Sequence, residues 1–158
     1  MPRKILTDQP QQRPDSVTVA LTTSNTTLVE APYFSIPITG EPNDPGITVD
    51  PADSDRELRP GEVFIGSQIA LANTGSVART VTLEVVREGG AVFARTVWVP
   101  PNDTRLLPPG FRLFKRDLGN PSAAGDLMRA RLTSGAGVSV IFSVIEREAL
   151  EHAPDTEA

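Results

Sequence analysis

The sequence predicts an all-β protein, an antiparallel β-sandwich or jelly roll of about eight strands. Two observations lead to this fold class. Hydrophobic residues recur at every second position through most of the chain, which is the period of a strand and not of a helix. Clusters of Gly, Pro, Asn and Ser separate these runs, as turns do in two-sheet proteins. A length of 158 residues fits one domain, and only residues 146–152 have the composition of a short helix.

The composition argues against several functional classes. The chain has no Cys and a single histidine, His152, so disulfides, Cys-ligated metals and most His-based catalysis are not expected. A net charge of −5 argues against general nucleic-acid binding. The sequence contains no apolar run of about 18 residues, so we expect no membrane span, and its start lacks the apolar segment of a signal peptide. We therefore expect a protein made in the cytoplasm that is not an enzyme and needs no cofactor.

The chain divides into an arm, a domain and a tail. Residues 1–16 are rich in proline and glutamine, which predicts an extended N-terminal arm because such a segment has little to bury. Residues 17–146 form the predicted sandwich domain, which includes a long, acidic, Pro-rich loop at residues 41–62. Alternatively, residues 47–49 form a short edge strand inside this loop. Residues 147–158 form an acidic C-terminal tail.

The first half of the domain reads as a series of short strands. Residues 17–22 and 26–30 are β-rich runs joined at a polar turn, and residues 33–38 form a third run. Prolines at the start and inside this third run confine it to an edge or a bulge, because proline has no N–H to donate. Residues 63–72 form the next strand, and residues 73–75 supply turn chemistry.

Residues 79–87 and 91–99 form the clearest predicted hairpin. Val81, Leu83 and Val85 alternate with polar residues, as on a strand with one buried face. Gly89 and Gly90 lie between this run and the next, and two glycines between alternating β-formers are a strong hairpin signal. The two segments should therefore pair antiparallel.

The last part of the domain predicts a return segment and a second hairpin. Residues 111–114 form a buried return segment. Residues 126–133 and 138–146 are separated by the glycine-containing turn 134–137, which predicts that these two strands pair with each other. The final strand is apolar on both faces, so we expect it to lie centrally in a sheet.

Two charged groupings are weak candidate sites. Asp50, Asp53, Asp55 and Glu57 are closely spaced carboxylates of the kind that bind calcium, although their spacing does not match an EF-hand loop and solvation is the more common explanation for acids in such a loop. Arg129 and Arg131 share one face of a strand, and Arg95 could lie near them. These arginines would then form either a basic stripe or an ordinary solvated outer face.

Residues 63–146 resemble small β-sandwich virion proteins of tailed bacteriophages. The resemblance is carried by the turn V-P-x-x-x-T at residues 99–104, the corner G-D-x-L at residues 125–128, with Met128 in its last position, and the closing S-x-x-E of residues 143–146. Residues 1–62 have no counterpart in these proteins, and residues 120–124 insert before the corner.

The resemblance implies a non-enzymatic virion structural protein that assembles in multiple copies on the capsid, as a decoration or cement protein, or as a tail accessory component. Its partners would be other virion subunits and further copies of itself, with no nucleic acid and no membrane. An extended arm and an edge strand are suited to such contacts. The candidate interface residues are Arg3, Lys4, Gln11, Gln12 and Arg13 in the arm and Asp53, Asp55, Arg56 and Arg59 in the loop.

Two other functions remain open from the sequence. One is a stand-alone β-sandwich module that recognises a surface glycan or protein. The other is a hydrolase built on the same scaffold, which would need two facing carboxylates in a pocket. The sequence does not identify such a pair.

Overall fold

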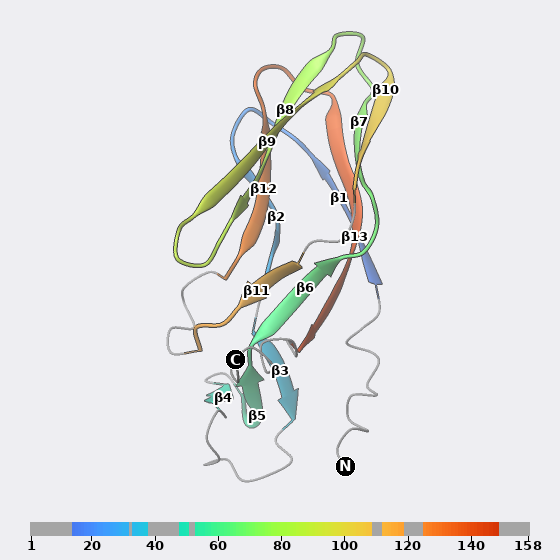
Figure 1. Cartoon of the computed structure of the whole chain (residues 1–158). Helices are drawn as coiled ribbons and strands as arrows, with labels where there is room; N and C mark the ends of the chain where they lie inside the picture. The colour runs from blue at the N-terminus through green and yellow to red at the C-terminus, as the bar shows by residue number, and fades with distance from the viewer. Residues whose placement is uncertain are drawn as a thin grey trace.

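The computed structural model describes residues 14–31, 33–37, 48–50, 53–108, 112–118 and 125–148, and the regular structure of these residues is entirely β (Figure 1). The strands are β1 (Pro14–Ala20), β2 (Thr26–Glu30), β3 (Phe34–Pro37), β4 (Thr48–Asp50), β5 (Asp53–Arg59), β6 (Gly61–Ile65), β7 (Ile69–Asn73), β8 (Arg79–Val86), β9 (Val92–Val99), β10 (Asp103–Leu107), β11 (Arg112–Lys115), β12 (Leu127–Leu132) and β13 (Val138–Glu148). Within these ranges, nothing forms a helix long and apolar enough to cross a membrane.

The strands form two larger antiparallel sheets and one small sheet. The first has six strands in the order β10-β7-β13-β6-β11, with β1 also paired to β13. The second has four strands in the order β2-β12-β8-β9. The third sheet, β3-β5-β4, lies below the other two in Figure 1. The predicted all-β, antiparallel class is therefore confirmed.

The strand registers show that some strands of the six-stranded sheet lie end to end. Counting two such strands as one row, the sheet has four rows. β1 runs along one edge of β13 from Ile145 to Ser139, so both β6 and β7 must pair with the opposite edge. Along that edge, β13 pairs first with β7, as far as Ile141↔Ala70, and then with β6, from Val144↔Ile65 onward. β7 and β6 therefore lie end to end, and the register shifts between them. In the same way β10 pairs with β7 and β11 pairs with β6. The rows are thus β1, β13, β7 with β6, and β10 with β11.

This arrangement explains one difference from the sequence prediction. Residues 63–72 were expected to form a single strand, but they belong to β6 and β7, which are interrupted at residues 66–68. Alternation of apolar residues continues on both sides of the interruption, so the sequence pattern does not reveal it. The described part of the chain has thirteen strands, more than the predicted eight or so, partly because predicted strands are interrupted. In the two larger sheets, ten strands make eight rows.

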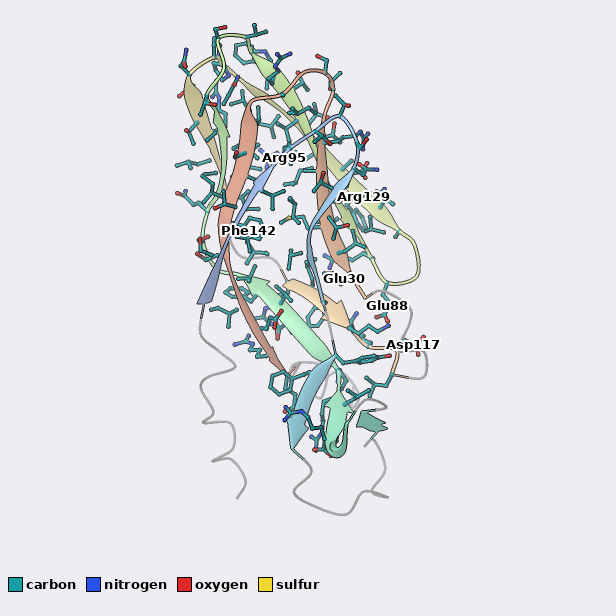
Figure 2. All side chains as sticks on the ribbon, turned by 180° about the vertical axis from the view of Figure 1, so that it is seen from behind. Glu30, Glu88, Arg95, Asp117, Arg129 and Phe142 are labelled. Atoms are coloured by element: carbon teal, nitrogen blue, oxygen red, sulfur yellow. The ribbon has the colours of Figure 1, made fainter. Side chains whose placement is uncertain are left out.

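One hydrophobic core joins the two larger sheets. Leu71 and Val140 come from the six-stranded sheet, and Val81 and Met128 from the four-stranded sheet, and all four are fully buried in the same cluster. Burial alternates along β12 and over most of β13, as expected when one face of each strand covers the other sheet. In Figure 2 the side chain of Phe142 lies on the β13 ribbon, and only 2% of this residue is exposed. Each such residue contributes about 1.5–3 kcal/mol by leaving water.

The central place of the last strand is confirmed, but the second hairpin is wrong. β13 has β1 on one edge and β6 and β7 on the other. β12 pairs with β2 and β8 in the opposite sheet, so the turn at residues 134–137 crosses between sheets. Gly135 and Gly137 have positive φ angles of 79° and 100°. Glycines allow a tight connection, but they do not decide whether the flanking strands pair or face each other across the core.

The first predicted hairpin is confirmed over its full length. β8 and β9 pair without interruption from Arg79↔Val99 to Val86↔Val92. Gly89 and Gly90 have φ angles of 103° and 105°, in the region that glycine adopts readily.

Residues 41–62 do not form a single loop where the structure describes them. β4, β5 and the start of β6 lie within this range, which agrees with the alternative of a short edge strand near residues 47–49. β5 was missed because charged residues interrupt its apolar pattern. β3, which ends at Pro37, is an edge strand as predicted.

The predicted ends of the domain also shift. β1 begins at Pro14, so the last residues of the predicted arm belong to a strand, while residues 1–13 lie outside the described ranges. β13 continues to Glu148, so residues 146–148 are extended and not helical. Its pairing with β6 extends to Glu148↔Gly61, and this favours a strand over the short helix that composition suggested. Residues 149–158 are outside the described part of the chain.

Asn73 connects the turn that follows β7 to the end of β9. Its Nδ2 lies within hydrogen-bond distance of three carbonyl oxygens, those of Val77 (2.9 Å), Val99 (3.2 Å) and Pro100 (3.1 Å). Its Oδ1 accepts a hydrogen bond of 2.9 Å from the N–H of Gly75. The residue is only 2% exposed, so water cannot replace these partners.

We expect Asn73→Ala to lower the free energy of unfolding by about 1–3 kcal/mol, because buried carbonyl and N–H groups lose their partner. Chemical denaturation measures the change. The exposed Ser76→Ala in the same turn is the control and should change stability by less than about 0.5 kcal/mol. Equal stabilities for the two variants would show that the Asn73 bonds do not hold this end together.

Candidate interaction surface

The residues proposed as a calcium site fall on β4 and β5. Asp50 lies opposite Asp53 across an irregular step in the β4–β5 pairing. The side chains of Asp50, Asp53 and Asp55 are outside the described part of the structure. Glu57 is described: it is 1% exposed, and its Oε1 lies 2.8 Å from Nη2 of Arg59. Among described side chains, no group of three or more His, Cys, Asp or Glu residues could hold a metal ion.

The candidate interface residues divide in the same way. Arg3, Lys4, Gln11, Gln12 and Arg13 lie outside the described residues. Arg56 is half-buried. Arg59 makes two ion pairs within the chain, one with Glu57 and one with Glu148 at 3.1 Å. Arg59 therefore holds the small sheet against the end of β13.

A second buried carboxylate lies beside this contact. The side chain of Glu62 on β6 is fully buried, with Arg147 of β13 and Arg112 of β11 each at 3.2 Å. Both guanidinium groups also lie over the ring of Phe64, at 5.9 and 5.5 Å from its centroid. A buried carboxylate is tolerated when charged partners surround it, so this cluster fixes the register of three neighbouring strands.

The predicted G-D-x-L corner is a structural junction. Asp126 is 1% exposed and accepts hydrogen bonds from Nη1 of Arg87 (2.9 Å) and from the backbone N–H groups of Glu88 (2.6 Å) and Phe114 (3.0 Å). Gly125 precedes it, and a Cβ atom there would come within 2.8 Å of backbone oxygens of Ala31 and Phe114. The corner thus joins the β8–β9 hairpin to β11 and leaves no room for a side chain at residue 125.

Glu88 extends this junction to the residues that follow β11. Its carboxylate accepts hydrogen bonds from the backbone N–H groups of Arg116 (2.9 Å) and Asp117 (3.0 Å), and Figure 2 shows Glu88 and Asp117 close together. The buried Lys115 lies 3.8 Å from Glu88 and 5.0 Å from the ring centroid of Tyr33. Burial, and then the charges of Asp117 and Glu88, raise the pKa of Tyr33, whose hydroxyl donates to the Asp117 carbonyl at 2.7 Å. The polar groups of this cluster therefore stabilise the fold through contacts within the chain.

The predicted arginine stripe is present only in part. Arg129 and Arg131 share the outer face of β12, and both pair with Glu84 of β8, at 2.6 and 3.1 Å. Arg95 lies opposite Leu83, whose side chain points into the core, so Arg95 lies on the other face of this sheet. Arg129 and Arg95 are labelled in Figure 2. Glu84 removes part of the positive charge, which favours a solvated outer face over a basic binding stripe.

Half of the exposed large hydrophobic residues among those described lie on β9. They are Val92, 48% exposed, Phe93, 62%, and Trp98, 57%, whereas Val77, Leu106 and Ile141 are scattered over other segments. Trp98 and Val92 lie on the outer face of the sheet with Thr80 and Val86 of β8, and Phe93 lies on the other face. β9 is the last strand of its sheet, and this edge is the candidate interaction surface. The sequence pattern predicted the strand β9, but it carries no signal that this strand lies at an edge.

Comparisons with known proteins do not identify a relative. No protein-family model matches the chain, and no curated protein matches it significantly.

The pairing of Glu84 predicts a stability that depends on pH. Hydrogen bonds from Arg129 and then Arg131 lower the pKa of Glu84 below its ordinary value of 4.5. Because the folded-state pKa is the lower one, the stabilisation is present above pH 4.5 and is lost as the pH falls through the folded-state pKa. We expect Glu84→Gln to lower the free energy of unfolding by about 1–3 kcal/mol at pH 7.

The cost of the same substitution should fall as the pH is lowered from 7, because the wild-type carboxylate takes up a proton once the pH passes its lowered folded-state pKa. Urea denaturation at a series of pH values measures this dependence. Glu30→Gln, on the exposed part of β2, is the control for removing one negative charge. A cost that stays the same at every acidic pH at which the wild-type protein remains folded would contradict the proposed pairing.

Proposed function

We propose that this chain is a non-enzymatic virion structural protein of a tailed bacteriophage, and that its fold is a jelly-roll β-sandwich. In this proposal it assembles in multiple copies on the capsid or as an accessory part of the tail, and is located in the virion. Its partners are other virion subunits and copies of itself, not nucleic acid or a membrane.

The observation that carries the proposal is the order of the eight rows. In chain order the eight rows are β1, β2, β6 with β7, β8, β9, β10 with β11, β12 and β13. With the rows numbered in this way, the first large sheet has the order 1-8-3-6 and the second has the order 2-7-4-5. Successive rows alternate between the sheets except at the β8–β9 hairpin, rows 4 and 5, which lie side by side in the second sheet. Two interlocked Greek keys, as in a jelly roll, would give this order. Viral capsid domains are among the main users of this arrangement.

Three further features support the proposal. The motifs that resemble phage virion proteins lie at structural positions: the residues 99–104 connect the two large sheets, and Asp126 forms the buried corner. Buried polar groups such as Glu62 and Asp126 make ion pairs within the chain, as expected for rigid structural parts. The apolar edge of β9 offers a surface for a neighbouring subunit.

A stand-alone binding module is the second candidate, because lectins also use the jelly roll. The feature that favours it is Trp98, an exposed ring on the outer face of a sheet that could stack on a sugar. A module of this kind would bind its ligand as a monomer, whereas the proposed virion protein functions in an ordered array.

Cryo-electron microscopy of intact particles of the phage that encodes this chain tests the proposal directly. We expect density for the two large sheets at symmetry-related positions on the head or tail. Particles that contain no copies of the chain would overturn the proposal.

Truncation separates the fold from assembly. β1 begins at Pro14 and pairs with β13 along its length, so deletion of residues 1–13 leaves all described strand pairs in place. We expect this deletion to leave the melting temperature nearly unchanged and to prevent incorporation into particles. Deletion of residues 1–20 is the control, because it also removes β1, exposes an edge of β13 and should lower the melting temperature. Full incorporation of the shorter deletion would rule out the arm as the attachment segment.

A further inference from the structure

Every second residue of β9 turns its backbone groups away from β8. Two hydrogen bonds fix which residues these are: Arg87 N–H donates to the Ala91 carbonyl at 2.7 Å, and Thr133 N–H donates to the Thr80 carbonyl at 3.0 Å. Bonded and non-bonded pairs alternate along an antiparallel ladder. The even-numbered residues of β8 therefore bond toward β12 and the odd-numbered ones toward β9. Through the β8–β9 register, the outward N–H and C=O groups belong to Val92, Ala94, Thr96 and Trp98.

This edge lacks most of the features that normally prevent pairing. Proteins protect free edges with prolines, lysines, bulges, short strands or charged residues that point inward, and of these β9 has only Arg95, on the inner face of the sheet but exposed. β9 is eight residues long, contains neither Pro nor Lys, and pairs with β8 without a bulge. The opposite edge of the same sheet, β2, is five residues long, and its pairing with β12 has a register shift. Of the two edges of this sheet, β9 is therefore the better suited to accept another strand.

The sequence of β9 selects one register for pairing with itself. Two antiparallel registers near the middle of the strand let the outward N–H and C=O groups of one copy meet those of the other, and both keep the two faces of the sheet continuous. In one, Thr96 lies opposite Thr96 of the second copy; in the other, Arg95 lies opposite Arg95. Like charges directly opposite each other are destabilising, which disfavours the second register. In the first, the small Ala94 lies opposite the large Trp98, and Arg95 lies opposite Val97.

We propose that β9 pairs antiparallel with β9 of a second copy of this chain, with the two-fold axis at Thr96, so that two four-stranded sheets become one sheet of eight strands. A second copy is the occupant because the strand is complementary to itself in this register: the small Ala94 faces the large Trp98, and the one charged residue, Arg95, faces Val97 and not its own copy. The inference also rests on the proposed function, which brings many copies together. One pair of edge strands is smaller than a standard interface of about 1,200–2,000 Å², so the pairing in solution is weak and an array strengthens it.

Introduced cysteines test both the pairing and its register, because the chain has no Cys of its own. In the proposed register Thr96 faces its own copy with a Cα–Cα distance of about 5.5 Å, which a disulfide can span. Residue 95 is offset from its own copy by two positions, at about 7–8 Å, which is too far. Thr96→Cys and the equally exposed Arg95→Cys are therefore a matched pair.

We expect purified Thr96→Cys protein under mild oxidation to form a disulfide-linked dimer at least about tenfold faster than Arg95→Cys, because pairing raises the local thiol concentration. Adding Ala94→Pro to the Thr96→Cys protein removes an outward N–H while keeping the bonds to β8, so it should slow the cross-linking. The melting temperature of each variant shows that it is folded.

Equal rates for Thr96→Cys and Arg95→Cys would overturn the proposal, and so would cross-linking that Ala94→Pro does not slow. Equal rates are also the result expected if another segment of the chain or a different protein covers β9. Faster cross-linking of Arg95→Cys would overturn the register. These measurements use purified protein without particles, so their failure leaves the virion location standing, and absence from particles leaves the β9 pairing standing.

Discussion

The structure depends on hydrogen bonding along both edges of β13. From residue 139 to 145 this strand has β1 on one side, and it has β7 and then β6 on the other. Where the register shifts between β7 and β6, the N–H of Ser143 donates to Oγ of Ser67 at 2.7 Å, so the interruption does not leave this amide unpaired. Because every neighbour is placed by its register with β13, the inward side chains of Val138, Val140, Phe142 and Val144 all face the second large sheet.

The sequence predicted the features that depend on local patterns. The alternation in residues 79–87 and the glycines that follow specify the β8–β9 hairpin, because a two-residue period and a glycine turn are local signals. Two kinds of features were missed. The glycines at 135 and 137 allow either a hairpin or a crossing between sheets, and only the shared core decides for the crossing. β5 was missed because the charged Glu57 occupies a buried position on it, and because Arg59, which pairs with Glu57, also pairs with Glu148, far along the chain.

The same reason limits what the sequence shows of the candidate surface. Glu62 pairs with Arg112 and Arg147, and Asp126 with Arg87, across separations that no motif records. Many charges that could suggest a site are thus used within the chain. β9 shows the opposite case: Phe93 and Trp98 were read as part of an ordinary alternating strand, yet they are exposed because the sheet ends there. An edge is a property of topology, and a sequence pattern alone does not reveal it.

Amide hydrogen exchange measured by NMR tests the account most directly, because it reports on both edges of a strand at once. With β13 central and β9 at an edge, we predict slow exchange at every residue from 139 to 145. Along β9 in the monomer, we predict slow exchange at residues 93, 95 and 97 and fast exchange at 94, 96 and 98. Alternating protection along β13, with every second amide exchanging fast, would show that one of its edges is open and would contradict the arrangement on which the fold and the proposed interface depend.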